Sequence, residues 1–217
     1  MDRTIKVKGT GKVSVRPDLV VITMKLESRH ADYDKTMEIA STSAAALTDA
    51  VVIAGFSREA LKTSHLNIRT DYESYHDEKN HYKTRFIGYV FDQHLKLEFD
   101  FDQTILSRVL NAIAGASVTP HLTIQFTVKD KEVVNADLLK SAVSNAQSKA
   151  EILCEAAGVA MGSLLNIDYS WVDSERYSGS DFTLEKISPA PRTLQVMDLE
   201  PENIEASDTV TCLWDII

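Results

Sequence analysis

The segment best suited to chemistry spans residues 71–82, Asp-Tyr-Glu-Ser-Tyr-His-Asp-Glu-Lys-Asn-His-Tyr. It combines two histidines with several carboxylates, and these groups bind divalent transition metals. His76 and His81, however, lie five positions apart in an expected loop. They lack the i, i+4 spacing that puts two ligands on one helix face. The composition therefore favours a solvated or subunit-contacting hairpin, with a metal or small-ligand site as the alternative.

The same segment contains tyrosines that suit a protein contact. Tyrosine offers a large, rigid surface with a polar tip and is enriched at interfaces. We therefore take Tyr75 and Tyr82 as candidate interface residues on the hairpin 71–87. Ordinary packing of these tyrosines within the strands is the competing interpretation.

The two cysteines, Cys154 and Cys212, do not look like redox sensors. A sensing thiol needs a depressed pKa and exposure to solvent. Cys154 has Glu151 and Glu155 nearby, which would raise its pKa, and Cys212 lies on the apolar face of an expected strand. Buried, reduced and unligated thiols are the prediction.

No motif in the chain specifies a reaction. It contains neither a G-x-S-x-G nucleophile elbow nor a P-loop. Residues 9–11, Gly-Thr-Gly, lack the third glycine and the following helix of a dinucleotide fingerprint. We predict no catalytic, cofactor-binding or metal residue and no enzyme activity. An unrecognised enzyme with a spatial triad remains a lesser alternative.

The elements that would position these residues follow from hydrophobic periodicity. Alternation at 5–15 and 19–27, around the turn Arg16-Pro17-Asp18, predicts an antiparallel hairpin. Stripes at spacings of three and four predict helices over 32–55 and 131–157, and Asp102 and Gly115 delimit a shorter helix. Further strands are expected near 66–72, 87–99, 122–128, 167–171 and 210–216. Residues 173–192 have the composition of a loop and are expected to be the most mobile internal segment.

This order of elements predicts an α+β fold, with a largely antiparallel sheet and two long helices packed on one face. We expect one domain over residues 1–217, within which 1–100 and 101–217 could form sub-units. The strand 87–99 has an apolar side, and Phe86 and Val90 add apolar groups to its opposite side. Helices on one face cannot cover both sides, and large exposed apolar faces are rare on monomers. We therefore expect a homo-oligomer.

Several motifs resemble those of the SIMPL (DUF541) family. Residues 9–18, Gly-Thr-Gly-Lys-Val-Ser-Val-Arg-Pro-Asp, resemble its N-terminal G-x-G-x-V-x-x-x-P-D signature. Residues 61–68 resemble the segment after its first helix, and Gly88-Tyr89 resembles its G-Y element. The alanine-rich helix ending at Ala157-Gly158 is also similar. The resemblance covers nearly the whole chain in the right order.

The resemblance implies an α+β fold and frequent self-assembly, and it supplies no family-wide catalytic residue. Some bacterial members are associated with protection against oxidative stress and others are cell-envelope antigens, while a eukaryotic relative is a kinase-associated signalling protein. The resemblance thus implies a self-assembling interaction or scaffold protein, with a link to stress response. A protein partner of unknown identity is a further expectation.

Composition limits the partners and the compartment. The net charge of −9, without a concentrated basic stretch, argues against nucleic acid. No apolar run approaches 18 residues, so no membrane span is expected. The first residues, Met-Asp-Arg-Thr-Ile-Lys-Val-Lys, do not resemble the signal peptide of many bacterial SIMPL members. With only two cysteines, these features predict a cytoplasmic protein.

Overall fold

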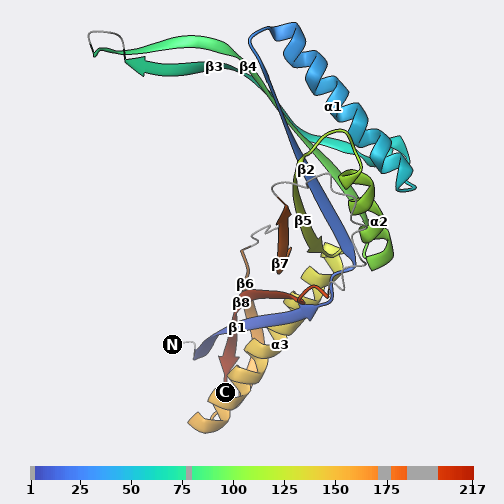
Figure 1. The fold of residues 1–217 in the computed structure, drawn as a ribbon. Coiled ribbons are helices and arrows are strands. Elements are labelled where there is room, and N and C mark those ends of the chain that lie inside the picture. The colour runs from blue at the N-terminus through green and yellow to red at the C-terminus, as the bar shows by residue number, and fades with distance from the viewer. Residues whose placement is uncertain (1–2, 77–79, 171–176, 185–199) are drawn as a thin grey trace. The chain divides into compact units, whose positions relative to one another are not determined.

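The structure, a computed structural model, describes residues 3–76, 80–170, 177–184 and 200–217 (Figure 1). These residues form an α+β fold, as the periodicity predicts. In chain order the elements are β1 (Thr4–Val15), β2 (Leu19–His30), α1 (Tyr33–Ile53), the 3-10 turn η1 (Arg58–Ala60), β3 (Lys62–His76), β4 (Tyr82–Asp100), α2 (Gln103–Ala114), β5 (His121–Thr127), α3 (Lys131–Ala157), β6 (Met161–Asp168), β7 (Tyr177–Leu184) and β8 (Ile204–Ile216).

The strands form two separate sheets. One has three strands in the order β1-β8-β6, and the other has five in the order β3-β4-β2-β5-β7. The chain divides correspondingly into two compact units. The first unit comprises 1–18, 127–180 and 201–217, and the second comprises 19–126 and 181–200. Each unit combines segments from different parts of the chain. The two units therefore differ from the sub-units 1–100 and 101–217 considered from the sequence.

The predicted hairpin of residues 5–27 is wrong, although both of its strands exist. β1 pairs antiparallel with β8 at the other end of the chain, from Thr4 opposite Asp215 to Val15 opposite Ile204. β2 pairs instead with β4 in the other sheet. The turn at Pro17 therefore carries the chain from one sheet to the other. Alternation predicts a strand with one buried face, but it does not identify the neighbouring strand.

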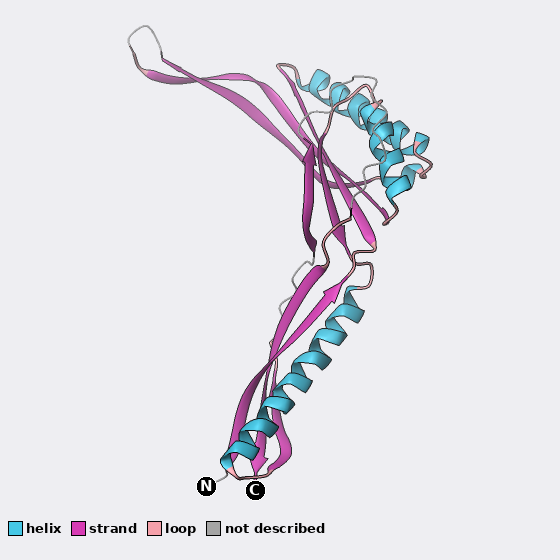
Figure 2. Ribbon diagram, turned by 60° about the horizontal axis from the view of Figure 1, so that its bottom comes forward, coloured by secondary structure: helices cyan, strands magenta, loops and turns pink. Residues whose placement is uncertain are grey.

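In the first unit α3 packs along the three-stranded sheet at very short range. Figure 2 shows this long helix following the strands of its sheet. A Cβ atom added to Gly9 would lie 2.1 Å from the carbonyl oxygen of Ala142, and one added to Gly11 would lie 2.1 Å from that of Leu138. The glycines of β1 and the alanine stripe of α3 thus let two backbones approach closely. The buried residues of α3 are Val134, Leu138, Ala142, Ala146, Ala150 and Cys154.

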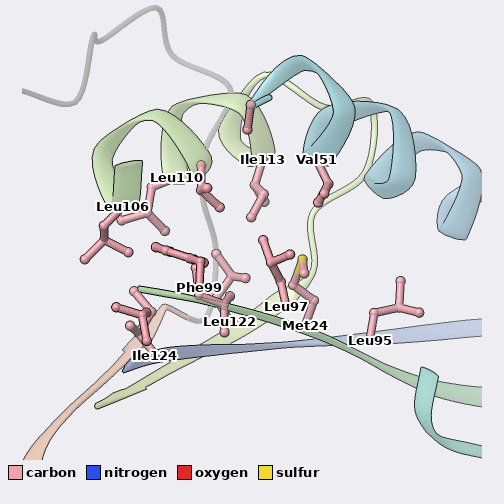
Figure 3. Close-up of a cluster of buried hydrophobic side chains, with 14 of the residues drawn as sticks. Met24, Val51, Leu95, Leu97, Phe99, Leu106, Leu110, Ile113, Leu122 and Ile124 are labelled. Atoms are coloured by element: carbon pink, nitrogen blue, oxygen red, sulfur yellow. The ribbon is translucent and has the colours of Figure 1, made fainter. Parts of the chain in front are cut away.

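In the second unit α1 and α2 cover one face of the five-stranded sheet. Figure 3 shows Leu106, Leu110 and Ile113 of α2 and Val51 of α1 directed toward side chains of the sheet. The sheet contributes Met24, Leu95, Leu97, Phe99, Leu122 and Ile124, all buried. Asp102 caps α2 as predicted, because its carboxylate accepts hydrogen bonds from the Thr104 and Ile105 amides.

The two long helices do not share one face of one sheet. α1 contacts β2 and β4, whereas α3 contacts β1 and β8. Part of the expected loop 173–192 is also ordered as β7, and the remaining residues of that loop lie outside the described residues. The strand expected near 167–171 is β6 and lies earlier in the chain, at Met161–Asp168. The helices were expected on one face because their two alanine-rich stripes look alike in sequence, although they cover different sheets.

The close contact of β1 with α3 predicts a specific sensitivity to side-chain size. Gly9→Ala should lower the free energy of unfolding by about 2–3 kcal/mol, because the new methyl group must displace helix backbone. Gly115→Ala is the control, since its Cβ would meet its nearest atom at 3.5 Å, an ordinary contact. Urea unfolding followed by circular dichroism measures both. Equal midpoints for the two variants would contradict the packing described.

Candidate interaction surface: the β3–β4 arm

The hairpin of β3 and β4 extends past the rest of its sheet. β2 pairs with β4 only as far as His30, which lies opposite Tyr89. β3 and β4 continue to pair with each other from Asp71 opposite Gly88 to His76 opposite Tyr82. We call the paired residues 71–76 and 82–88 the arm. Figure 1 shows it extending beyond β2 and α1.

Gly88 marks the point where the arm leaves the sheet. Its φ of +150° is rarely adopted by residues with a side chain, and an added Cβ would lie 2.4 Å from the carbonyl oxygen of His30. The register also shifts between Asp71 and Tyr72. The backbone therefore changes direction at the end of β2, where the chain of the β2–α1 turn passes closest.

One face of the arm is aromatic. The ring of Phe86 lies 5.9 Å from that of Tyr72 and 5.2 Å from that of Tyr89, which in turn lies 5.4 Å from Tyr33 of α1. Tyr82 lies further along the arm and donates a hydrogen bond of 2.7 Å to the Ser74 hydroxyl. Tyr72, Phe86 and Tyr82 are 58%, 47% and 68% exposed. This face presents a row of aromatic side chains to solvent.

The opposite face of the arm is charged. Arg85 donates from Nε to the Glu73 carboxylate at 2.8 Å, and the two residues lie opposite each other in the register. The guanidinium carbon of Arg85 also lies 5.5 Å from the centre of the Tyr75 ring. Lys83 lies opposite Tyr75 on this face. Tyr75 is thus partly covered within the arm, in contrast to Tyr82.

The structure places both predicted interface residues on the arm but on opposite faces. Tyr75 and His76 are consecutive residues of a strand and point to opposite sides. Tyr82 lies opposite His76, with ring centres 5.8 Å apart, and so shares its side. A flat partner can therefore contact Tyr82 or Tyr75, but not both. The aromatic face, to which Tyr82 belongs, is the better candidate for a contact.

The arm brings no metal-ligand cluster together among the described residues. Among the residues that the structure describes, His, Cys, Asp and Glu side chains do not gather in groups of three or more that could hold a metal ion. Residues 77–79 of the original candidate segment lie outside the described residues. The ring of His76 packs against Tyr82, which is a contact within the arm.

The face of the five-stranded sheet away from the helices is charged, which corrects the expectation of a second apolar face. Val90 is fully buried, but its neighbours across β3 and β2 are Arg69 and Arg29. Arg29 pairs with Asp71 at 3.0 Å and Arg69 with the buried carboxylate of Asp92. Long charged side chains cover apolar surface with their stems while their heads reach water. This face therefore needs no partner subunit to cover it.

Phe86 also lies on a different side of the strand from the one expected. Simple alternation places it opposite the side of Tyr89, yet the two rings are in contact. The register shift near Gly88 reverses the alternation, since one residue of β4 is left unpaired there. The arm thus carries several exposed apolar side chains of this unit, and others, such as Ile53 and Val52, lie on α1.

The sheet brings together two histidines that sequence reasoning did not connect. His65 of β3 lies opposite His94 of β4, and their ring centres are 5.0 Å apart. Burial lowers the pKa of His94, and the nearby His65 and Lys25 lower this pKa further, whereas Asp92 acts to raise it. Only the alternation of both strands, combined with their register, could have revealed this pair in advance.

Both cysteines are buried and form no disulfide. Cys154 belongs to the buried stripe of α3, whereas its neighbour Leu153 is exposed. Cys212 lies opposite Val7 beneath α3, and burial raises the pKa of its thiol. The predicted burial of both thiols is confirmed, and their reduced state stays a prediction.

Comparison with known families accounts for this architecture. A family model described as "SIMPL: Protein of unknown function (DUF541)" matches residues 5–214. The chain belongs to the SIMPL family. The resemblance inferred from Gly9–Asp18 and Gly88-Tyr89 is therefore confirmed over nearly the whole length. Both glycine motifs coincide with close backbone approaches, to α3 and to the β2–α1 turn.

Two curated relatives of this SIMPL chain are similar to it. The 26 kDa periplasmic immunogenic protein of Brucella melitensis biotype 1 is 26% identical over 164 residues, and that of Brucella abortus (strain S19) is 25% identical over 164 residues. Each match covers 75% of this chain and 65% of the relative, so the chain matches less than two thirds of either protein. Within the described residues, no helix has the length and apolarity needed to cross a bilayer.

The burial of the SIMPL thiols predicts slow chemical modification. A thiol reagent should label Cys154 and Cys212 at least about a hundredfold more slowly in the native protein than in urea, because both thiols are buried and burial raises the pKa of Cys212. Mass spectrometry of quenched samples gives the rate for each residue. Labelling of both thiols at the rate of a free cysteine would refute the buried placement.

The lowered pKa of His94 predicts a loss of stability in acid. The folded state binds this proton less readily than the unfolded state, so stability falls as the pH decreases below the ordinary histidine pKa of about 6.5. His94→Gln should therefore reduce the fall in unfolding free energy between pH 7 and pH 5. His76→Gln, at an exposed position on the arm, is the control. An unchanged pH slope in His94→Gln would exclude this role.

Proposed function

We propose that this SIMPL chain is a non-enzymatic, self-assembling interaction protein that uses the aromatic face of the β3–β4 arm as its contact surface. The observation that carries the proposal is the two-stranded arm itself, with Tyr72, Phe86 and Tyr82 exposed along one face. The other face of the arm is polar and carries the ion pair between Arg85 and Glu73. The two faces thus differ in the way expected of a contact surface and a solvent surface.

Two physical arguments support a partner for the arm. An isolated two-stranded hairpin is marginally stable in water, so a ribbon of this length gains order from contact with another surface. Exposed aromatic side chains also supply most of the energy in typical interfaces, with about 2 kcal/mol or more for a central residue. Tyr82 is the most exposed of the three aromatic residues and lies closest to the tip.

A second copy of the chain is the proposed partner. The aromatic face can meet the same face of another copy across a two-fold axis, which is the commonest symmetry of homo-oligomers. Tyrosine hydroxyls at the edge of such a contact remain able to bind water. The self-assembly implied by the family resemblance agrees with this arrangement. A different protein partner on the same face is the alternative outcome.

Compartment and physiological setting belong to the proposal as well. The proposed cytoplasmic location rests on the two buried cysteines, which form no disulfide, whereas the Brucella relatives carry the word periplasmic in their names. Cell fractionation distinguishes the two locations. A link to stress response rests on the family resemblance, and survival of a deletion strain after peroxide treatment tests it.

The proposed contact predicts different effects for the two tyrosines. Tyr82→Asp should weaken self-association about tenfold or more, because it places a charge in the aromatic face. Tyr75→Asp should have a smaller effect, since Tyr75 lies on the charged face beside Arg85. Sedimentation equilibrium at micromolar concentration measures both variants.

Two outcomes would remove parts of this proposal. The mass of a single chain for the wild-type protein would end the self-assembly hypothesis. A wild-type oligomer that persists in Tyr82→Asp would remove the aromatic face from the interface. Tyr82→Phe, which keeps the ring and loses the hydrogen bond to Ser74, serves as the control for folding of the arm.

A further inference from the structure

The open face of the five-stranded sheet, opposite α1 and α2, carries two consecutive rows of basic side chains. In the first row Lys62 of β3 lies opposite Lys96 of β4. In the second row His65 lies opposite His94, and His94 lies opposite Lys25 of β2. Residues paired across antiparallel strands project from the same face. Five groups that are cationic or can become so therefore meet within a few residues.

This arrangement disfavours the charged forms of its groups unless something neutralises them. Like charges directly opposite each other on neighbouring strands are destabilising. Here one lysine pair and one histidine pair occur in adjacent rows, in a protein with a net charge of −9. A local conflict of this kind is typical of functional sites, where a ligand supplies the missing interaction.

The carboxylates that border the two rows are each engaged with cations. Asp92 accepts a hydrogen bond from Arg69 and lies 3.9 Å from Lys25, and Glu98 pairs with Lys96 at 2.6 Å. Glu59 lies within electrostatic reach of Lys62.

On β2, Glu27 pairs with Arg29 at 3.5 Å. Arg69 adds a further cation beside Asp92. The border carboxylates therefore offset the lysines in part and leave the two imidazoles facing cationic neighbours, most directly Lys25.

Space for a ligand adjoins the second row. A hollow of about 410 Å³ is lined by Lys25, Glu27, Thr119 and His121. Lys25 therefore belongs both to the row and to the wall of the hollow. The Thr119 hydroxyl and the exposed imidazole of His121 add hydrogen-bonding groups on the β5 side. A small molecule can lie over the row with its remaining atoms in this hollow.

We propose that this surface binds a small polyanion of the diphosphate class through Lys25, His65, His94, Lys62 and Lys96. Ammonium and imidazolium groups bind phosphate oxygens by charge-assisted hydrogen bonds. Two rows separated by two residues along a strand lie about 7 Å apart, so two linked phosphate groups reach both rows and a single phosphate reaches one. This binding site is independent of the arm.

The histidines make the binding dependent on pH. His94 is faced by His65 and Lys62 from β3, by Lys25 and Glu27 from β2, and by Asp92 and Lys96 on its own strand. The lowered pKa of His94 follows from its burial and from the basic neighbours. A bound polyanion reverses the influence of those neighbours and raises the pKa of His94. By linkage, affinity increases as the pH falls.

The test uses inorganic pyrophosphate and the full chain. Calorimetry at pH 6 and pH 8 should show binding that is tighter at pH 6, and tighter for pyrophosphate than for orthophosphate. Lys25→Gln should weaken it about tenfold, because a hydrogen bond to a charged group is lost. Lys140→Gln, with the same charge change at an exposed site on α3, should leave affinity within about twofold.

A second measurement needs no variant. The imidazole resonances of His94 should titrate at higher pH when pyrophosphate is present than when it is absent. Absence of binding, equal losses in Lys25→Gln and Lys140→Gln, or an unchanged titration of His94 would each overturn the proposal.

Discussion

The pairing of β4 with both β2 and β3 is the interaction on which the second unit depends. β4 runs from Tyr82 to Asp100, and its alternating side chains point to two different environments. One side, including Leu95, Leu97 and Phe99, enters the core beneath α1 and α2. The other side carries the charged groups of the open face. Because β2 ends at His30, the same strand continues as one half of the arm. A single strand thus links the core, the basic rows and the aromatic surface.

The first unit depends on a different constraint, the short distance between β1 and α3. Gly9 and Gly11 remove the side chains that would hold the helix away from the sheet. The pairing of β1 with β8 along its whole length then joins both ends of the chain in one sheet. The chain accordingly leaves this unit at Asp18 and returns near Thr127, where the Asp18 amide donates to the Thr127 carbonyl oxygen. Interleaving of the units follows from this closure.

The two proposed surfaces of the second unit differ in chemistry because they differ in pairing. On the arm, each of the two strands pairs only with the other, and exposed aromatic rings remain for a partner. On the open face, β4 has neighbours on both sides, and its pairing with β3 brings distant residues such as His65 and His94 into contact. Ion pairs of Asp92 with Lys25 and of Arg29 with Asp71 make the rest of that face polar. A protein contact suits the first surface, and a small polyanion suits the second.

The sequence alone determined most of the elements, because periodicity and caps are local, although it did not predict β7 within the expected loop 173–192. Both long helices, the Asp102 cap, the Gly158 terminus and the 71–87 hairpin follow from patterns within a few turns of chain. Only the tertiary structure decided which strands pair, since alternation is the same for any neighbour. In the structure β1 pairs with β8 and not with the expected β2, and the two long helices cover different sheets. Tyr75 and Tyr82 lie on opposite faces of the arm. The basic rows could not be read from sequence either, because register across strands unites residues about thirty positions apart.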